Sequence, residues 1–328
     1  MTTRILVTGG AGFIGSHYVR TLLGPDGPGD VAVTVLDSLT YAGNPANLDA
    51  VRAHPGFRFV RGDICDPAAV DPLMAEHDQV VHFAAESHVD RSIDGGDTFI
   101  RTNVLGTHTL VAAAHRAGIQ TFVQISTDEV YGSIDEGSWP ETHPLRPSSP
   151  YSSAKASGDL IALSYHHTHG LDVRVTRCSN NYGHHHFPEK AIPLFITHLM
   201  DGRKVPLYGD GGNVRDWLHI DDHVQGIELV RTRGRAGEIY NIGGGTELTN
   251  RQLVELLLAE FGTDWAGAVE QVADRKGHDR RYSVDCTKIR EELGYAPRVP
   301  FTTGLADTVR WYRENRAWWE PLKARAAL

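Results

Sequence analysis

Short apolar runs alternate with longer amphipathic segments along the first half of the chain. The apolar runs have the length of buried strands, and they lie at residues 4–8, 31–36, 57–60, 79–83, 121–125 and 171–176. Helical patterns lie between them, at residues 16–23, 99–117 and 150–169. Alternating strands and helices predict an α/β fold of the Rossmann type, with a doubly wound parallel sheet.

The alternation becomes irregular after residue 177. A loop is predicted at 180–183, short strands at 204–208 and 238–242, and helices at 192–200, 221–230, 249–261, 287–293 and 302–315. No Pro- or Gly-rich linker separates the two halves. We therefore expect a Rossmann domain over residues 1–177 and a smaller domain over residues 178–328 that is interleaved with the first.

A glycine-rich turn follows the first predicted strand. Gly9, Gly12 and Gly15 form Gly-x-x-Gly-x-x-Gly, and Gly10 starts an overlapping Gly-x-Gly-x-x-Gly. Glycines at these positions allow a tight turn and the close approach of a pyrophosphate to the N-terminus of the next helix. The second strand ends at Asp37, about 20 residues farther on, where an acid binds a ribose 2′-hydroxyl and repels a 2′-phosphate. The pattern therefore predicts NAD rather than NADP.

Two further strand ends are candidates for the cofactor site. Asp63 and Ile64 follow the third strand at the position of the adenine, although an ordinary turn acid explains Asp63 almost equally well. Small residues follow the fourth strand and leave room for a cofactor; this segment is Ala84, Ala85, Glu86, Ser87 and His88.

A group of proton carriers follows the strand at 121–125. Asp128 and Glu129 stand at its end, and Tyr151 and Lys155 are spaced to share one face of the next helix. A cation beside a phenol lowers the phenol pKa, so Tyr151 could remove a hydroxyl proton near a hydride acceptor. Tyr-x-x-x-Lys and Asp-Glu are each common on protein surfaces. Together with a nicotinamide site, they indicate oxidation coupled to elimination.

Charge and composition exclude several classes of protein. The net charge of −9 does not favour a nucleic-acid surface, and no apolar run approaches the ~20 residues of a membrane span. The N-terminus has no signal-peptide pattern, and three widely spaced cysteines, Cys65, Cys178 and Cys286, look like reduced thiols. We expect a cytoplasmic protein.

Basic residues and histidines lie near the loops of the second half. Lys190, Arg215 and Arg275 could bind a diphosphate, whereas Arg281 is more typical of a surface charge. Three consecutive histidines occupy 184–186, but adjacent loop residues cannot all face one ion. We therefore expect no metal site there, and instead a sugar-site lining or a surface loop.

Nearly the whole chain resembles the extended short-chain dehydrogenase/reductase family, and within it the sugar-nucleotide 4,6-dehydratases. The motifs that carry the resemblance are TGGAGFIGSH, HFAAESHVDRS, STDEVYGS, PYSSAKASGD, RCSNNYG, FPEK, YGDGGNVRDW, YNIGGG and DRKGHD. The Thr-Asp-Glu run is the most specific of them, because 4-epimerases of the same family lack its Asp-Glu pair.

The resemblance implies a role for each matching residue. Those implied at NAD are Gly9, Gly12, Phe13, Ile14, Gly15, Asp37, Ser38, Leu39, Thr40, Asp63, Ile64, Ala84, Ala85, Glu86, Ser87, His88, Thr102, Tyr151, Lys155 and Asn181. Those implied at the nucleotide sugar are His88, Thr127, Asn180, Lys190, Pro206, Tyr208, Arg215, Asn241, Arg275 and His278. Catalysis would rest on Thr127, Asp128, Glu129, Tyr151 and Lys155.

The implied reaction converts dTDP-glucose to dTDP-4-keto-6-deoxyglucose and water, in deoxysugar biosynthesis for secondary metabolism. The resemblance also implies a homodimer built on the helices at 99–117 and 151–169. The loop HHHFP at 184–188 and the segment RKGHD at 275–279 depart from the family pattern, which leaves dTDP and UDP sugars open. The alternatives are an NAD-dependent 4-epimerase and, in another class, a non-catalytic dinucleotide-sensing protein.

Overall fold

The computed structural model describes residues 2–326, so the outermost residues of the two expected domains, 1 and 327–328, lie outside the described range. Within it the main sheet has seven parallel strands in the order β10-β6-β5-β4-β1-β2-β3. The strands are β1 (Thr3–Thr8), β2 (Val31–Asp37), β3 (Phe57–Arg61), β4 (Gln79–His82), β5 (Thr121–Thr127), β6 (Val173–Cys178) and β10 (Ile239–Ile242). The strand order reverses between β1 and β4, as in doubly wound nucleotide-binding folds, so the predicted fold class is confirmed.

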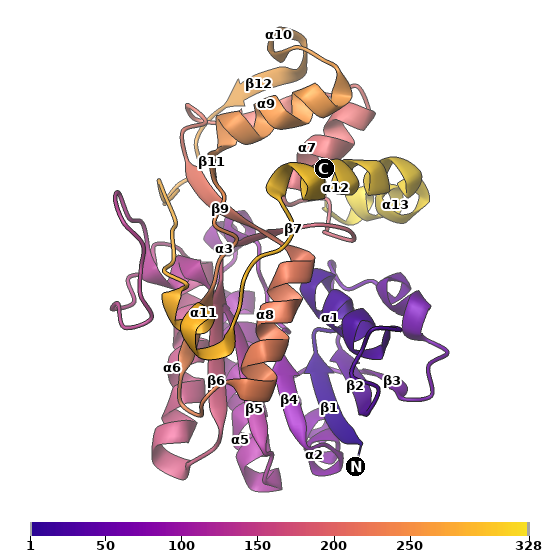
Figure 1. Cartoon of the computed structure of the whole chain (residues 1–328), viewed down its shortest axis with the longest axis vertical. Coiled ribbons are helices and arrows are strands. Elements are labelled where there is room, and N and C mark those ends of the chain that lie inside the picture. Colours follow the sequence, from indigo (N-terminus) through magenta and orange to yellow (C-terminus); the bar gives the residue numbers. More distant parts are fainter. Residues whose placement is uncertain (1, 327–328) are drawn as a thin grey trace.

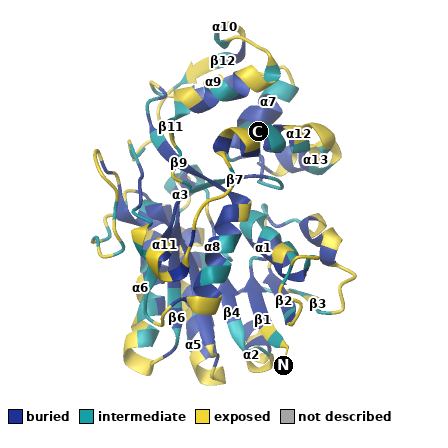
Figure 2. Ribbon diagram, viewed as in Figure 1, coloured by how far each residue is buried: buried dark blue, intermediate teal, exposed yellow. Residues whose placement is uncertain are grey.

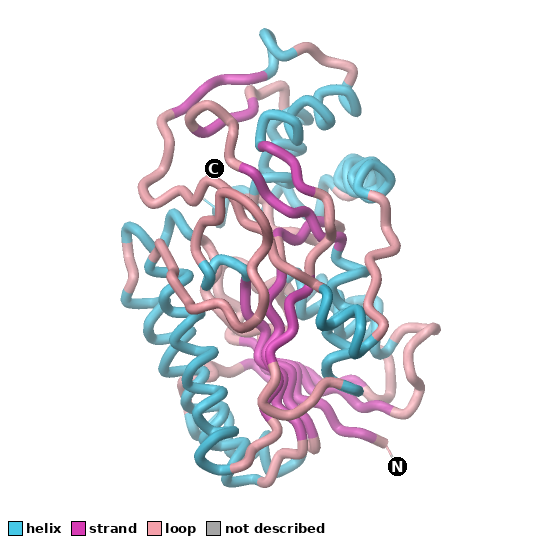
Figure 3. Tube along the Cα trace, turned by 60° about the vertical axis from the view of Figure 1, so that its left-hand side comes forward, coloured by secondary structure: helices cyan, strands magenta, loops and turns pink. Residues whose placement is uncertain are grey.

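Helices cover both faces of this sheet (Figures 1 and 3). One face packs on α2 (Pro67–Glu76), α5 (Thr107–Ala117) and α6 (Pro150–His169), and the other on α1 (Phe13–Leu23), α8 (Ile220–Arg233) and α11 (Thr287–Leu293). Successive residues of β1 illustrate the two layers: Ile5 and Val7 join the α1 side, whereas Leu6 joins the α5 side. Because both faces are covered, most residues of the central strands are buried (Figure 2).

A smaller region with its own apolar core lies beyond the carboxyl ends of the strands (Figure 1). Its helices are α7 (Ala191–Met200), α9 (Asn250–Phe261), α10 (Trp265–Ala268), α12 (Phe301–Glu314) and α13 (Arg316–Ala326). Its strands are β7 (Asn180–Tyr182), β8 (Val205–Tyr208), β9 (Val214–His219), β11 (Glu247–Thr249) and β12 (Val269–Val272). The chain returns to the main sheet at α8, β10 and α11 between parts of this region, so the two regions interleave. The boundary at residue 177 stays a prediction.

Some elements differ from the sequence-based expectation. The loop expected at 180–183 contains β7, which pairs with β9 in a small sheet. The helix expected at 99–117 is one helical run with three parts, α4 (Asp97–Phe99), a π-helical segment η2 (Ile100–Gly106) and α5. Asn103 in η2 is buried and bonds both backbone groups of Glu86 at 2.9 Å. The π turn therefore holds the segment after β4 in place.

Short helical segments not expected from the pattern complete the chain: η1 (Pro45–Val51), α3 (Val89–Asp94) and η3 (Asp128–Tyr131). Among residues 2–326, no helix combines the length and the apolar character needed to cross a membrane.

Candidate active site

The glycine turn lies between β1 and α1, at the point where the strand order reverses. Gly9 has a left-handed backbone (φ +69°), and a Cβ there would lie 2.5 Å from the backbone nitrogen of Ala84. A Cβ on Gly15 would lie 2.4 Å from the carbonyl oxygen of Gly9. Gly12 precedes α1 and offers no side chain to cap it. The first N–H groups of α1 therefore remain open to an anion, which fits the pyrophosphate of NAD.

Asp37 at the end of β2 connects this turn to the next loop. Its Oδ2 accepts from the backbone N–H of Ala11 at 2.9 Å, and its Oδ1 from that of Leu39 at 2.8 Å. Burial raises the pKa of the Asp37 carboxyl, against the effect of the two backbone donors. Each oxygen retains a second lone pair, so Asp37 can hold Ser38 to Thr40 and still accept from a ribose hydroxyl.

Asp63 and Ile64 follow β3 at the same edge of the sheet. Asp63 accepts from the backbone N–H of Cys65 at 2.8 Å and lies 3.5 Å from the guanidinium of Arg101, beside Thr102 on η2. Ile64 packs in the core on the α5 side. The structure brings these residues to the cofactor edge, and their contact with the adenine stays a prediction.

The segment after β4 passes between the cofactor edge and the smaller region. The backbone N–H of Ala84 donates to Thr8 at 3.3 Å, and the carbonyl of Ser87 accepts from Lys190 at 2.6 Å. His88 caps α3, and burial together with Lys190 lowers the His88 pKa to about 3. The His88 ring is therefore neutral at physiological pH.

Thr127 and Asp128 stand where β5 gives way to η3. Thr127 Oγ1 donates to Asp128 Oδ1 at 3.2 Å and accepts from the backbone N–H of Glu129 at 3.3 Å. Asp128 is only 3% exposed, and its Oδ2 has no hydrogen-bond partner within residues 2–326. Burial, and then Glu129, raise the Asp128 pKa well above its usual range. Asp128 therefore suits a general acid, because a raised pKa favours the protonated carboxyl.

Glu129 differs from Asp128 in the charges that surround it. Burial raises the Glu129 pKa, but Arg275 and Arg215 both oppose that rise. Its Oε2 lies 3.5 Å from the hydroxyl of Tyr282. The two adjacent acids therefore occupy different environments, as expected when one acts as acid and the other as base.

Tyr151 and Lys155 lie on the first turns of α6. Ser149 and Ser152 form a capping box around Pro150, which fixes the start of this helix. Tyr151 is buried, and burial, followed by Glu129, raises its phenol pKa. Lys155 Nζ donates to the carbonyl of Ile125 at 2.6 Å. Burial and the neighbouring carboxylates set the direction of this shift, so the expected lowering of the Tyr151 pKa by Lys155 is not found in the protein by itself.

Two asparagines on β7 offer acceptors to the site. The side-chain oxygens of Asn180 and Asn181 are buried and have no hydrogen-bond partner in the described chain. The Asn181 amide donates to the carbonyl of Ser179 at 2.9 Å, which holds its oxygen in one direction. Unpaired buried acceptors of this kind fit a ligand that carries amide or hydroxyl donors.

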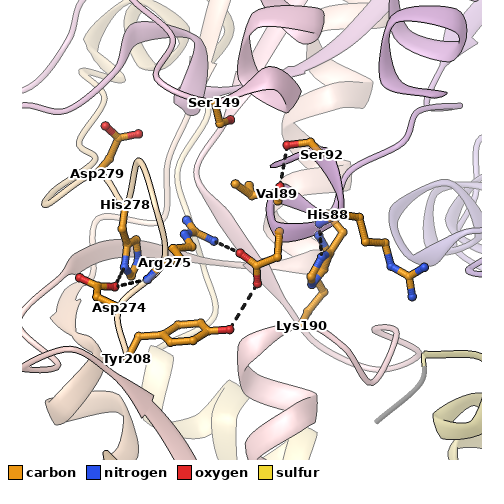
Figure 4. Close-up of polar contacts among 12 residues, drawn as sticks. His88, Val89, Ser92, Ser149, Lys190, Tyr208, Asp274, Arg275, His278 and Asp279 are labelled. Atoms are coloured by element: carbon orange, nitrogen blue, oxygen red, sulfur yellow. Dashed lines mark hydrogen bonds and ion pairs between the residues drawn. The ribbon is translucent and has the colours of Figure 1, made fainter. Parts of the chain in front are cut away.

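Figure 4 shows the basic residues that face the candidate substrate site. Arg275 lies 3.7 Å from Asp90, and Tyr208 donates to the same carboxylate at 3.4 Å. His278 approaches Asp274 at 2.6 Å on the same loop as Arg275. Lys190, Arg275 and Arg215 gather from three elements, a clustering of cations that suits a diphosphate.

Arg215 is almost fully buried on β9, as expected for a functional cation. Its guanidinium lies 4.2 Å above the ring of Tyr282 and donates to the carbonyl of Asp279 at 3.0 Å. Arg281 instead forms an ion pair with Glu247 at 2.7 Å. The Arg281 side chain is only 17% exposed, so the expectation of a surface charge is wrong for it; Arg281 differs from Arg215 in being neutralised by a carboxylate.

Asn241 requires a correction. It lies on β10, is fully buried, and accepts from Tyr131 at 3.0 Å. Its amide nitrogen donates to Trp139 and Asp285 at 2.9 and 3.2 Å. These bonds occupy the Asn241 side chain inside the protein, so the structure gives it a structural role.

Pro206 lies on β8 with Tyr208.

The histidine loop at 184–186 is half-buried rather than a surface loop. The His186 ring stacks on Phe13 with a centroid distance of 4.2 Å. His184 and His185 pack against Trp311 of α12, at 5.5 and 4.4 Å. The loop therefore joins the start of α1, with Phe13 and Ile14, to the C-terminal helices.

The sequence pattern did not reveal three residues of this site. Tyr282 lies beside Glu129, Asp279 lies beside Tyr282, and Asp90 lies between Arg275 and Tyr208. Asp90 and Asp279 do fall inside motifs shared with the family, HVDRS and DRKGHD. That position in a motif was the only available signal, because neither periodicity nor charge distinguishes them.

Comparisons with known proteins show the family of the chain. A family model described as GDP-mannose 4,6 dehydratase matches residues 6–308. A dTDP-glucose 4,6-dehydratase of Streptomyces griseus is 69% identical, covering 98% of both chains. The crystal structure of DesIV, a dTDP-glucose 4,6-dehydratase from Streptomyces venezuelae with NAD and TYD bound, superposes with a TM-score of 0.96 at 63% identity, covering 98% of this chain and 100% of the other.

A UDP-glucose 4-epimerase from Thermotoga maritima, crystallised with UDP-glucose, shares the fold at a lower level. It has a TM-score of 0.88 at 32% identity, covering 96% of this chain and 100% of the other. The chain therefore belongs to the GDP-mannose 4,6 dehydratase family, in which it groups with the dTDP-glucose 4,6-dehydratases.

Proposed function

We propose that the chain is an NAD-dependent hydro-lyase that converts dTDP-glucose to dTDP-4-keto-6-deoxyglucose and water. The observation that carries this function is the pair of adjacent acids beside Tyr151, a buried Asp128 and a half-buried Glu129, both with a raised pKa. Oxidation alone needs only the tyrosine. Elimination also needs a proton donor for the leaving hydroxyl group and a base for the C5 proton, and Asp128 and Glu129 can supply these two functions.

NAD, when bound, supplies a reversible hydride acceptor and a positive charge that favours loss of the Tyr151 proton. The glycine turn, Asp37 and the segment from Ala84 to His88 would hold it. Tyr151 then takes the proton of the sugar 4-hydroxyl, which Thr127 orients from the end of β5. Lys155, fixed on the carbonyl of Ile125, supports the charge that develops on the phenol.

Elimination is the task of the two acids. The 4-keto group acidifies the C5 proton, and Glu129 removes it as general base. Asp128 gives its proton to the departing 6-hydroxyl, which leaves as water. Glu129 later returns a proton to C5, while C6 gains the hydride that C4 lost. Lys190, Arg215 and Arg275 bind the diphosphate and hold the sugar at these groups.

We also infer a homodimer, since apolar side chains stand exposed on the helices named for it. Ile100 and Leu105 on η2 are 53% and 47% exposed, and Leu160 on the neighbouring α6 is 61% exposed. An apolar patch on adjacent helices favours a paired surface. A role in deoxysugar biosynthesis follows from the product, and a cytoplasmic location remains a prediction.

The decisive experiment incubates the purified protein with dTDP-glucose and, separately, with UDP-glucose. We expect dTDP-glucose to yield a product lighter by one water, with the alkaline ultraviolet absorbance of a keto sugar. A product of unchanged mass with inverted C4 would instead establish the 4-epimerase. Unchanged substrate from both incubations, with NAD bound, would favour the dinucleotide-sensing protein.

A further inference from the structure

A chain of hydrogen-bonding groups leads from Glu129 to the protein surface. The Tyr282 hydroxyl lies 3.5 Å from Glu129 Oε2 and donates to Asp279 Oδ2 at 2.6 Å. Asp279 is half-buried on the loop that also carries Arg275 and His278 (Figure 4), and the exposed Ser148 donates to the same Asp279 oxygen. The half-buried base Glu129, the buried phenol of Tyr282, the carboxylate of Asp279 and solvent therefore follow one another in order.

The middle of this chain is held rigidly. Tyr282 is 2% exposed, and Arg215 lies over its ring while donating to the backbone carbonyl of Asp279. One guanidinium thus fixes both Tyr282 and Asp279. Burial, and then Glu129, raise the pKa of the Tyr282 phenol. A phenol that stays protonated can pass on its own proton only while it accepts another.

We propose that Tyr282 and Asp279 form a proton relay between Glu129 and solvent. This inference rests on the proposed function, in which Glu129 takes the C5 proton. Protonated Glu129 gives its proton to the Tyr282 oxygen while the Tyr282 proton passes to Asp279, which releases a proton to water. The reverse transfers bring a solvent proton back to Glu129. Each O–H bond broken is matched by one formed, and no electrons move between groups.

The relay determines whether the hydrogen removed from C5 returns to C5 or is replaced by one from solvent. With the relay intact, Glu129 exchanges its proton with solvent before it reprotonates C5. With the relay interrupted, Glu129 keeps the proton that it removed and returns it. Substrate labelled with deuterium at C5, converted in ordinary water, therefore reports the relay by the label that remains in the product. Immediate borohydride reduction at low conversion prevents later exchange of the keto product.

The test uses Tyr282→Phe, which removes the hydroxyl and leaves the ring beneath Arg215. Loss of a proton-transfer group slows transfer by about 10²-fold or more, so we expect the retained label to rise from a minor to a major fraction. Purely structural damage would instead lower the label retained at C5, because slower turnover leaves Glu129 more time to exchange its proton with solvent. Retention equal to or below that of the unaltered protein would overturn the relay.

A second variant and a matched control complete the experiment. Asp279→Asn interrupts the outer link on a half-exposed loop and should also raise retention, even if Tyr282→Phe fails to fold. Tyr295→Phe loses a similarly buried hydroxyl, which donates to the carbonyl of Gly243 at 3.0 Å rather than to the relay, and should leave retention unchanged.

Failure of the relay can be distinguished from failure of the proposed function. If the unaltered protein releases no dehydrated product, the proposed function is wrong. If it dehydrates the sugar but retains the whole C5 label, Glu129 does not exchange with solvent and the relay is wrong. Retention in Asp279→Asn equal to that of the unaltered protein would also reject the relay.

Discussion

Single residues of the site owe their chemistry to burial. Asp128, Glu129 and Tyr151 all have raised pKa values because the fold removes them from water. Only Glu129 faces two arginines that oppose the shift. Differences in neighbouring charge between two adjacent acids are enough to separate an acid from a base.

Asp128→Asn should slow the loss of water by about 10²–10⁴-fold while oxidation at C4 survives, because the amide cannot supply a proton. Reduced nicotinamide would then accumulate, which its absorbance measures during a single turnover. The exposed Asp135→Asn serves as the control and should behave like the unaltered protein. Loss of C4 oxidation together with dehydration would remove Asp128 from this role.

The histidines predict how stability depends on pH. His223 on α8 is fully buried, and burial and His17 lower its pKa to about 3. The unfolded chain, with a His pKa near 6.5, binds more protons between those two values. Stability from His223 is therefore complete above about pH 6.5 and falls as pH decreases, by up to about 1.4 kcal/mol per pH unit.

The corresponding experiment is calorimetric melting of His223→Leu between about pH 7 and pH 5. We expect its Tm to fall less steeply with decreasing pH than that of the unaltered protein. His167→Leu, at an exposed position on α6, should retain the original slope. Equal slopes for His223→Leu and the unaltered protein would contradict the assignment.

At the scale of elements, several strands of the main sheet place candidate site residues at their carboxyl ends. The glycine turn follows β1, Asp37 ends β2, and Thr127 ends β5. Parallel strands share one direction, so these ends meet at one edge of the sheet. The apolar runs alone were sufficient to predict that meeting point.

Gly15→Ala tests the glycine turn as an element. The added Cβ would lie 2.4 Å from the carbonyl oxygen of Gly9, so α1 must shift away from the turn. We expect purified protein with much less bound NAD, measured after acid release of the cofactor. Gly95→Ala, whose Cβ would meet its nearest neighbour at an ordinary 3.8 Å, should keep its NAD. Normal NAD content in Gly15→Ala would contradict the tight fit.

Apart from β8, which matches the strand expected at 204–208, the short strands of the smaller region were not predicted from periodicity. β9 (Val214–His219) includes Arg215 and Asp216, and both charged residues are buried. The Asp216 carboxylate accepts from the backbone of Gly244 and Thr246, and Arg215 packs on Tyr282. In the sequence these charges look like a polar loop, because their partners lie about 30 or more residues away.

At the scale of the whole molecule, the site lies where the two regions meet. Glu129 comes from the large sheet, whereas Arg275 and Tyr282 come from the chain beyond residue 270. Their approach depends on the return of α8, β10 and α11 to the main sheet. The expectation of interleaved regions captured this arrangement in outline, but not the residues that it brings into contact.

Leu160→Arg tests the proposed dimer. In a dimer, the new arginine would be buried in an apolar interface without an ionic partner. We therefore expect the variant to sediment as a monomer. Ala259→Arg, at an exposed position on α9, is the matched control and should not change the mass. A monomeric unaltered protein, or a dimeric Leu160→Arg variant, would contradict this surface.

The sequence by itself determined the sheet, the cofactor edge and the identity of the proton carriers, since each depends on local patterning within a strand, turn or helix. Only the tertiary structure decided their protonation and their partners. Asp128 became an acid and Tyr282 a neighbour of Glu129 because folding buried them together, and Asn241 was enclosed for the same reason. Burial and long-range charge depend on residues distant in the chain, which no local pattern records.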